Sequence, residues 1–568
     1  MKQLVVLFLM TSSVHAIAQP VLSGVDISVK EKYRAQVAEA IKITGQPNVR
    51  DTNIQKLPVE INLRLRTLIP SPKMELIPPI RIARTKLYRL PSNTVMLSTG
   101  NFYTTLLGFS FGNARDPIQT WGVQGRYFSS YGGFQVSDEM GRRKSVFENS
   151  SWLENGLSGH YNRVLSRGRL LTRASANHDR YSFYGQPHIL GTNDSDTLGN
   201  APLRWIRDYQ AEVKYEHSGY KRKQLFQSAN IGSHHWIDQG GRQVETGLNS
   251  AVNWRLPAAD IYIDLPLKAN LNRLSGTSRT DSAGRLITNN YWSAQFAPAI
   301  ADSAGNLSFK IGLNVMFDGV VSDSVGNFSR PYFPPVVHVE FPLVKNVLNI
   351  YGGYEGILEN GGMRSRVKQT PFLAENSRYE IVRSSSLYGG VNGRLSSAVG
   401  YRFGARQRSY DNYAMVTRNP DYYGIGMDSG RLSLDYVKLN YFEPSGELTF
   451  QNSLGWELRG FALFRIGIND SIYHLPSSQI GGQIHFNLKD KIRFESTIIR
   501  HGERKALIGW SLIDLAPYWD GRLSFVYTYN DQLNATLKID NIFNSRIDWW
   551  SGYTVQGFRA NLGLVYKF

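Results

Sequence analysis

The C-terminal part of the chain alternates apolar and polar residues with a period of two. Runs at 484–488 and 492–498 lie on either side of the polar residues 489–491. Two further runs, 523–529 and 533–539, repeat the arrangement. Successive side chains of a β-strand point to opposite faces, so each pair of runs predicts two antiparallel strands joined by a tight turn.

The same alternation continues back to about residue 92, and the connections differ in length. Short turns are expected near 166–168 and 218–221, whereas longer irregular stretches are expected at 130–154, 184–203, 275–288, 360–378 and 409–431. Short turns at one end and long loops at the other are typical of an outer-membrane barrel. If a strand with its connection averages about 22 residues, residues 92–568 form roughly 22 strands. We therefore predict an all-β, transmembrane, antiparallel outer-membrane β-barrel.

The first residues predict export. Lys2 precedes an apolar run at 4–10, and the small-residue stretch Ala16-Ile17-Ala18 follows. The run is too short to span a bilayer, which needs about 20 residues. Residues 1–18 are thus predicted to be a signal peptide that is cleaved after Ala18.

Residues 19–91 differ from the rest of the chain because they are rich in proline and in basic residues. Their prolines are Pro20, Pro47, Pro58, Pro70, Pro72, Pro78, Pro79 and Pro91. Proline at this density disfavours both helices and central strands. We expect an extended periplasmic tail. It could cover or partly fill the lumen, bind a partner, or serve only as a tether.

Composition narrows the function classes. The chain has no Cys, which excludes a disulfide framework, a thiolate metal site, a Cys nucleophile and a lipoprotein anchor. The formal net charge is +18. Nucleic-acid binding is not expected of an exported barrel. The charge could instead attract anions to the lumen or contact lipopolysaccharide through loop cations such as Arg142, Arg143, Lys144, Arg364 and Arg366. Simple solvation of loops and tail is the favoured interpretation.

The sequence gives little sign of catalysis. His234 and His235 are adjacent, so on a strand they point to opposite faces, and solvation is favoured over a shared metal. A Walker A element, a Gly-x-Ser-x-Gly elbow and a His-Glu-x-x-His motif are all absent from the sequence. No catalytic, cofactor-binding or metal-binding residue is predicted, and no cofactor. A barrel hydrolase with dispersed residues stays open as a third, less favoured alternative.

The last strand carries the most specific pattern. One face is apolar or aromatic, with Phe558, Leu562, Leu564, Tyr566 and Phe568 as its large residues. Arg559 and Lys567 fall on the other face, where they are candidate basic residues of the lumen. A terminal aromatic on such a strand resembles the signal that the barrel-assembly machinery recognises in outer-membrane proteins.

The same region resembles a known family. Leu537–Asn544 is followed by an aromatic loop with Trp549, Trp550 and Tyr553, and then by Gly557-Phe558-Arg559 and the closing Tyr566-Lys567-Phe568. This order resembles the end of a TonB-dependent-receptor barrel, although Gln556-Gly557-Phe558-Arg559 stands where the family has Pro-Gly-Arg. The region 25–103, with 85–88 and 100–102, resembles barrel proteins of Bacteroidota that are related to these receptors in the barrel only.

The resemblance implies a role in the Gram-negative outer membrane, in contact with its lipid and lipopolysaccharide. Residues 19–91 are too short and too rich in proline for the globular plug of such receptors, so energised import is not expected. The implied function is passive or partner-gated passage of small solutes. The alternative is a structural or assembly component that docks periplasmic or lipoprotein partners through the tail.

Overall fold

The structure is a computed structural model. It describes residues 93–568 except 114–115, 133–134, 138–142, 146–150, 185–202, 218–225, 240–241, 259–260, 281–285, 303–306, 323–325, 375–376, 419–430, 469–471 and 509–510. The predicted signal peptide, tail and domain boundary near residue 92 lie outside the described residues and stay predictions. In the part of the chain described, no helix has the length and apolar character needed to cross a membrane.

The large sheet contains 25 strand segments. In chain order these are β1 (Thr94–Gly100), β2 (Thr104–Asn113), β3 (Gln119–Tyr131), β6 (Ser151–Leu165), β7 (Gly168–Ser182), β8 (Leu203–His217), β9 (Phe226–Asp238), β10 (Gln243–Ala258), β11 (Ile261–Thr280), β12 (Leu286–Phe296), β13 (Ala299–Asp302), β14 (Ser308–Leu313), β15 (Val315–Ser322), β16 (Gly326–Tyr332), β17 (Pro335–Val344), β18 (Leu348–Glu359), β19 (Val382–Arg394), β20 (Val399–Thr417), β21 (Ser433–Gln451), β22 (Trp456–Phe464), β23 (Ser478–Leu488), β24 (Ile492–His501), β27 (Tyr518–Thr528), β28 (Leu533–Asp540) and β31 (Arg559–Lys567).

Shorter elements lie in the connections. Three small hairpins are formed by β4 (Gln135–Ser137) with β5 (Arg143–Ser145), β25 (Arg504–Ile508) with β26 (Ser511–Leu515), and β29 (Asp548–Trp550) with β30 (Tyr553–Thr554). The helix α2 (Gly362–Gln369) lies between β18 and β19.

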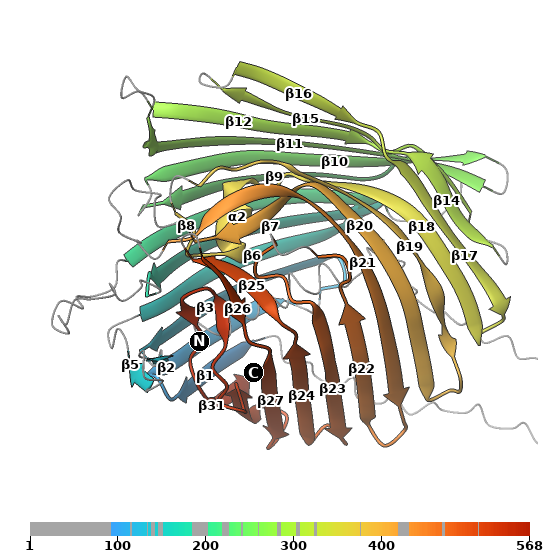
Figure 1. The fold of residues 1–568 in the computed structure, drawn as a ribbon. Helices are drawn as coiled ribbons and strands as arrows, with labels where there is room; N and C mark the ends of the chain where they lie inside the picture. The colour runs from blue at the N-terminus through green and yellow to red at the C-terminus, as the bar shows by residue number, and fades with distance from the viewer. Residues whose placement is uncertain are drawn as a thin grey trace, which may run out of the picture. The chain divides into compact units, whose positions relative to one another are not determined.

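The segments form a closed antiparallel barrel of 22 strands (Figure 1). Three barrel strands are each interrupted once, and their halves are β12 with β13, β14 with β15, and β16 with β17. The first and last strands close the ring, because β1 pairs with β31 from Thr94↔Lys567 to Gly100↔Asn561. The predicted fold class and the count of about 22 strands are confirmed.

The two ends of the barrel differ, and we name them by their connections. The turn end holds Asn93, whose N–H donates to the carbonyl of Phe568 (3.1 Å), and the short connections such as 489–491. The loop end holds the long connections, including 360–381 and 541–558. Lys489 and Asp490 have φ of 47° and 59°, which is the conformation of a tight hairpin turn, as predicted.

Two predicted loops are shorter than expected. The stretch 275–288 is wrong as a loop, because β11 continues to Thr280 and β12 begins at Leu286. The stretch 409–431 begins too early, because β20 continues to Thr417. Both stretches are rich in residues that favour turns, but cross-strand pairing overrides that preference.

A line of two prolines and an asparagine lies where one side of the barrel is kinked. The three interrupted strands break at Pro298, Asn314 and Pro334, which lie side by side. The N–H of Leu313 donates to Pro298 O (3.1 Å), and the N–H of Asn314 donates to Pro334 O (2.9 Å). Proline has no N–H to donate to the ladder, so adjacent strands change direction together at this line. The bend is visible where β12, β15 and β16 meet β14 and β17 (Figure 1).

Candidate functional site

The connection between β18 and β19, residues 360–381, folds into the barrel, and we call it the lumen loop. Its helix α2 lies inside the ring, where it contacts β10 and β11 (Figure 1). Gly362 begins the helix at φ +72°, and an added Cβ would come within 2.0 Å of a carboxylate oxygen of Glu245 on β10. Glycine therefore permits both the backbone turn and the close approach to the wall.

Charged groups attach the lumen loop to β8. Asp208 is almost fully buried, and its carboxylate accepts from Arg364 Nε (2.7 Å) and Lys368 Nζ (2.5 Å) of α2. Glu245 accepts from the backbone N–H of Arg364 (3.2 Å). Burial lowers the pKa of Lys368, and the nearby carboxylate of Asp208 opposes that shift. A buried carboxylate held by two cations is costly to leave unpaired, so this contact keeps the helix docked.

Arg204 on β8 makes a second attachment. Its guanidinium donates to Asp238 Oδ2 through Nη2 (2.5 Å) and, through Nη1, to the carbonyls of Pro371 (2.9 Å) and Leu373 (2.6 Å). The whole side chain is buried. Asp238 balances the charge of Arg204, while the two loop carbonyls accept from its Nη1.

Amide and hydroxyl groups extend the attachment to β11 and β12. Asn360 accepts from Asn272 Nδ2 (3.0 Å) and from the hydroxyl of Tyr379 (3.2 Å), and its own Nδ2 donates to Ser293 Oγ (3.1 Å). The hydroxyl of Tyr379 also accepts from the N–H of Gly362 (3.0 Å). Burial raises the pKa of Tyr379, which keeps this hydroxyl protonated.

The loop also reaches the opposite wall. Leu373 forms a parallel bridge with Leu432, the residue before β21. The N–H of Ala374 donates to Leu432 O (2.6 Å), and the N–H of Leu432 donates to Phe372 O (3.0 Å). In the order of the sheet, β8 and β21 lie about half of the 22-strand circumference apart, so the lumen loop spans the barrel.

A second connection, residues 541–558 between β28 and β31, packs on the lumen loop, and we call it the closing loop. The rings of Phe372 and Tyr553 stack with centroids 3.9 Å apart. Tyr184, which follows β7, packs edge-on against both, at 5.5 and 5.1 Å. Trp152 on β6 packs edge-on against Phe372 from the wall, at 6.4 Å. Aromatic pairs of these geometries each add about 0.5–1.5 kcal/mol beyond their burial.

Together these contacts form one apolar core at the loop end, and we call the two loops with this core the cap. Its buried members include Phe128, Trp152, Tyr181, Tyr184, Ile206, Trp236, Leu274, Tyr291, Met363, Val367, Phe372, Leu373, Tyr379, Leu432, Leu434, Tyr518, Trp549 and Tyr553. They come from strands on both walls and from both loops. The cap therefore crosses the lumen as a packed layer.

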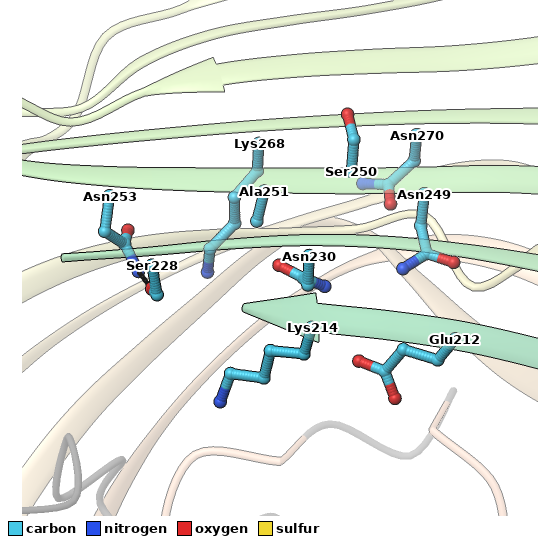
Figure 2. A pocket seen from close by; sticks show the side chains of 10 residues that line it. All are labelled: Glu212, Lys214, Ser228, Asn230, Asn249, Ser250, Ala251, Asn253, Lys268 and Asn270. Carbon is cyan, nitrogen blue, oxygen red and sulfur yellow. Dashed lines mark hydrogen bonds between the residues drawn. The ribbon is translucent and has the colours of Figure 1, made fainter. Parts of the chain in front are cut away.

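Below the cap, the inner wall has a polar hollow on β8 to β11. Lys214, Asn230, Ala251 and Lys268 lie opposite one another across these four strands, and Glu212, Gly232, Asn249 and Asn270 form the next row. The centre of the hollow has only small side chains, those of Gly232 and Ala251. Its volume is about 370 Å³, and its lining is Glu212, Lys214, Ser228, Asn230, Asn249, Ser250, Ala251, Asn253, Lys268 and Asn270 (Figure 2).

The residues predicted for the last strand lie where the alternation placed them. The large apolar side chains are exposed on the outer face, with Leu562 at 65% and Leu564 at 54%. Phe558, Tyr566 and Phe568 are also exposed. Recognition of this strand by the assembly machinery stays a prediction.

Arg559 and Lys567 occupy the inner face of the same strand, in the rows of Asp540 and Thr94. Arg559 is fully buried and donates to Asp540 Oδ2 from Nη2 (2.7 Å). Its charge is thus paired within the wall. An effect of either residue on the solutes of the lumen stays a prediction.

The two histidines point to opposite faces, as predicted. His234 faces inward with Nε2 3.1 Å from Glu245 Oε1, and His235 faces outward beside Thr246. The described residues contain no group of three or more His, Asp or Glu side chains that could hold a metal.

The sequence did not identify the cap. The stretch 360–378 is predicted only as a long loop, and Arg364 only as a loop cation open to lipopolysaccharide. The structure instead turns Arg364 inward to Asp208, which is 156 residues away in the chain. The aromatic residues Trp549, Trp550 and Tyr553 are the one sign of a packed loop in the sequence.

Solved structures share the fold of this chain. The siderophore receptor PirA from Acinetobacter baumannii aligns with a TM-score of 0.62 at 11% identity, over 84% of this chain and 80% of that one. The FrpB iron transporter from Neisseria meningitidis gives 0.61 at 9% identity, over 85% and 82%. A variant of the ferric enterobactin receptor from Pseudomonas aeruginosa gives 0.59 at 11%, over 84% and 80%.

These matches are structural, and at such identity they establish the barrel fold alone. No family model matches the sequence. No curated protein matches it either. The resemblance to TonB-dependent-receptor barrels predicted from the last strand is thus supported at the level of architecture. The absence of a plug and a Bacteroidota type stay predictions.

Proposed function

We propose that this chain is an outer-membrane barrel that lets small polar solutes pass when its cap is released. The observation that carries the proposal is the combination of a polar inner wall with a cap that spans the lumen. The outer face is apolar, as a lipid-facing wall requires. The structural matches are named as receptors and a transporter, which supports transport as the class of function.

The orientation follows from general properties of such barrels. Short turns and chain ends belong on the periplasmic side and long loops outside, so the cap closes the external mouth. The cap is held together by a buried apolar core. We therefore expect the resting barrel to be closed and not an open diffusion pore. Passage then requires that a solute or a partner protein shifts the cap, which makes the passage gated.

The ion pairs of α2 give a direct test. In the double variant Arg364→Met, Lys368→Met, Asp208 is left buried without its cations, which typically costs about 3–5 kcal/mol. Undocking of the helix is expected to appear as frequent open steps in planar-bilayer conductance of the purified protein. Arg378→Met is the matched control, because Arg378 lies in the same loop with 78% of its side chain exposed. Its conductance should equal that of the wild type.

A second function is favoured by the same closed cap: a structural component that docks periplasmic or lipoprotein partners. It predicts a barrel that stays silent even when residues 363–378 are replaced by a short Gly-Ser linker. Open steps in that replacement, with barrel folding confirmed by a heat-modifiable gel shift, would reject the structural role. Silence of the folded replacement would reject gated passage.

A further inference from the structure

The polar hollow on β8 to β11 contains side chains that have no polar partner among the residues that the structure describes. Asn253 donates to Ser228 (3.1 Å), and Lys214 pairs with Glu216 (2.5 Å) outside the hollow. By contrast, Glu212, Asn230, Asn249 and Lys268 make no side-chain hydrogen bond or ion pair with any described residue. Among the side chains without such a contact, one anion, one cation and two amides face the same space.

The two unused charges lie on different strands of the hollow. Glu212 is on β8 and Lys268 on β11, which are three strand spacings apart, or about 14 Å between backbones. Figure 2 shows the Lys268 ammonium and the Glu212 carboxylate on either side of Asn230, with Asn253 and Ser228 beyond Lys268. The two residues also lie in successive rows of the sheet, so a ligand that contacts both charges must be an elongated molecule.

We propose that the hollow binds a short zwitterionic peptide of two or three residues, an inference that deepens the proposed function and rests on it. The peptide carboxylate pairs with Lys268 and its ammonium with Glu212. The amides of Asn230 and Asn249 each offer a donor and an acceptor, which matches the N–H and C=O of a peptide bond. The volume of about 370 Å³ equals roughly twelve water volumes of about 30 Å³, enough for such a ligand.

Other solute classes fit the hollow less well. A neutral polyol would satisfy the two amides but leave Glu212 and Lys268 unpaired. A simple anion would pair with Lys268 but meet the carboxylate of Glu212. The lining contains no aromatic side chain, so stacking does not contribute to selection. A ligand with one charge at each end satisfies all four unused groups.

Calorimetric titration of the purified full chain in detergent tests the proposal. Tri-alanine is the probe, and N-acetyl-tri-alanine and tri-alanine amide each lack one charge. We expect each blocked peptide to bind at least about tenfold more weakly, as loss of a charge-assisted hydrogen bond implies. Glu212→Gln should remove the discrimination against the acetylated peptide, and Lys268→Met that against the amide.

Two further variants control for shape and for distant charge. Ala251→Leu keeps every polar group but fills the centre of the hollow, and should abolish binding in a barrel whose folding is confirmed by its gel shift. Lys538→Met removes an inner-face lysine on β28, far from the hollow in the order of the sheet, and should bind as the wild type does.

The outcomes separate this site from the proposed function. The titrations are repeated on Arg364→Met, Lys368→Met, so that a closed cap does not hide the hollow. Absence of tri-alanine binding in both proteins, or equal binding of the blocked peptides, would overturn the proposal. Binding with the expected discrimination in a barrel that never conducts would retain the site and reject only the passage.

Discussion

His474 holds the closing loop through both of its ring nitrogens. It lies in the connection between β22 and β23 with φ +61°, and its ring packs against Trp550 at 5.2 Å. Nδ1 is 3.1 Å from Val416 O, and the N–H of Ser551 points to Nε2 at 3.0 Å. Since Nδ1 must donate and Nε2 must accept, the imidazole is neutral. Burial, and after it the charge of Arg504, lower the pKa of His474 to about 3.

This histidine predicts that acid loosens the cap. Between pH 6.5 and about 3, an unpacked His474 binds a proton that the packed one does not. The stability of the cap is therefore full above pH 6.5 and falls by up to about 1.4 kcal/mol per pH unit below it. We expect the open fraction in planar bilayers to rise from pH 7 to pH 4.

The variant His474→Asn isolates this effect, because asparagine tolerates positive φ and does not titrate. Its open fraction should depend less on pH than that of the wild type, whereas His485→Asn, on the inner wall of β23, should keep the wild-type slope. Equal slopes for wild type and His474→Asn would show that other groups carry the acid response.

Single residues of the cap are the least predictable part of the molecule from sequence. Asp208 lies in an ordinary alternating run of β8, where an inward carboxylate needs no special partner. Its partners Arg364 and Lys368 come from a loop between two other strands. The inward direction of that loop depends on contacts with β8, β10 and β21, which no local pattern records. The pair of Arg559 and Asp540 is easier to predict, because the register of two neighbouring strands places them opposite each other.

At the level of elements, the line formed by Pro298, Asn314 and Pro334 explains why three strands break where they do. Pro298 and Pro334 cannot donate to the ladder, and Asn314 between them supplies its side-chain Nδ2 to Gly356 O (3.3 Å) on β18. Pro334 packs directly over Gly356, where an added Cβ would come within 2.2 Å of the proline ring. The bend therefore depends on a missing side chain in the neighbouring strand.

Gly356→Ala is predicted to destabilise the barrel by about 1–3 kcal/mol, the usual cost of overpacking a rigid contact. The measured quantity is the temperature at which the folded barrel, seen as the faster heat-modifiable gel band, converts to the band of the unfolded protein. Gly352→Ala is the matched control on the same strand, because its Cβ would find its nearest neighbour, Tyr388 O, at 3.4 Å. If both variants converted at the same temperature, the contact between Pro334 and Gly356 would not be a source of stability.

Strands and tight turns were largely predictable, because both depend on local chemistry. The alternation at 484–488 and 492–498 gives β23 and β24, with the turn at Lys489 and Asp490. The prediction of a loop at 275–288 was wrong. Ser275, Gly276 and neighbouring polar residues favour a turn, yet Ser275 and Gly276 pair with both β10 and β12 in the structure. Pairing partners far away in sequence thus decide where a strand ends.

For the whole molecule, closure follows from the period of two and the even number of strands. An antiparallel sheet with an apolar outer face cannot leave a free edge in a bilayer, so β31 must return to β1. The fold class was therefore readable from the alternation. Whether the lumen is open or closed could not be predicted from the alternation, because it depends on how the long loops pack against one another. Only the packed structure shows that the mouth is capped.

The membrane setting itself is testable at the last strand, where one face should meet lipid and the other the lumen. Leu562→Lys places a charge on the outer face near the middle of β31, which in lipid costs about 2–4 kcal/mol. Val565→Lys adds the same charge to the inner face of the same strand. Because the inner wall is polar, we expect only Leu562→Lys to lower the yield of heat-modifiable barrel in outer-membrane fractions. Equal yields would mean that this face does not meet lipid, and the outer-membrane assignment would fail with it.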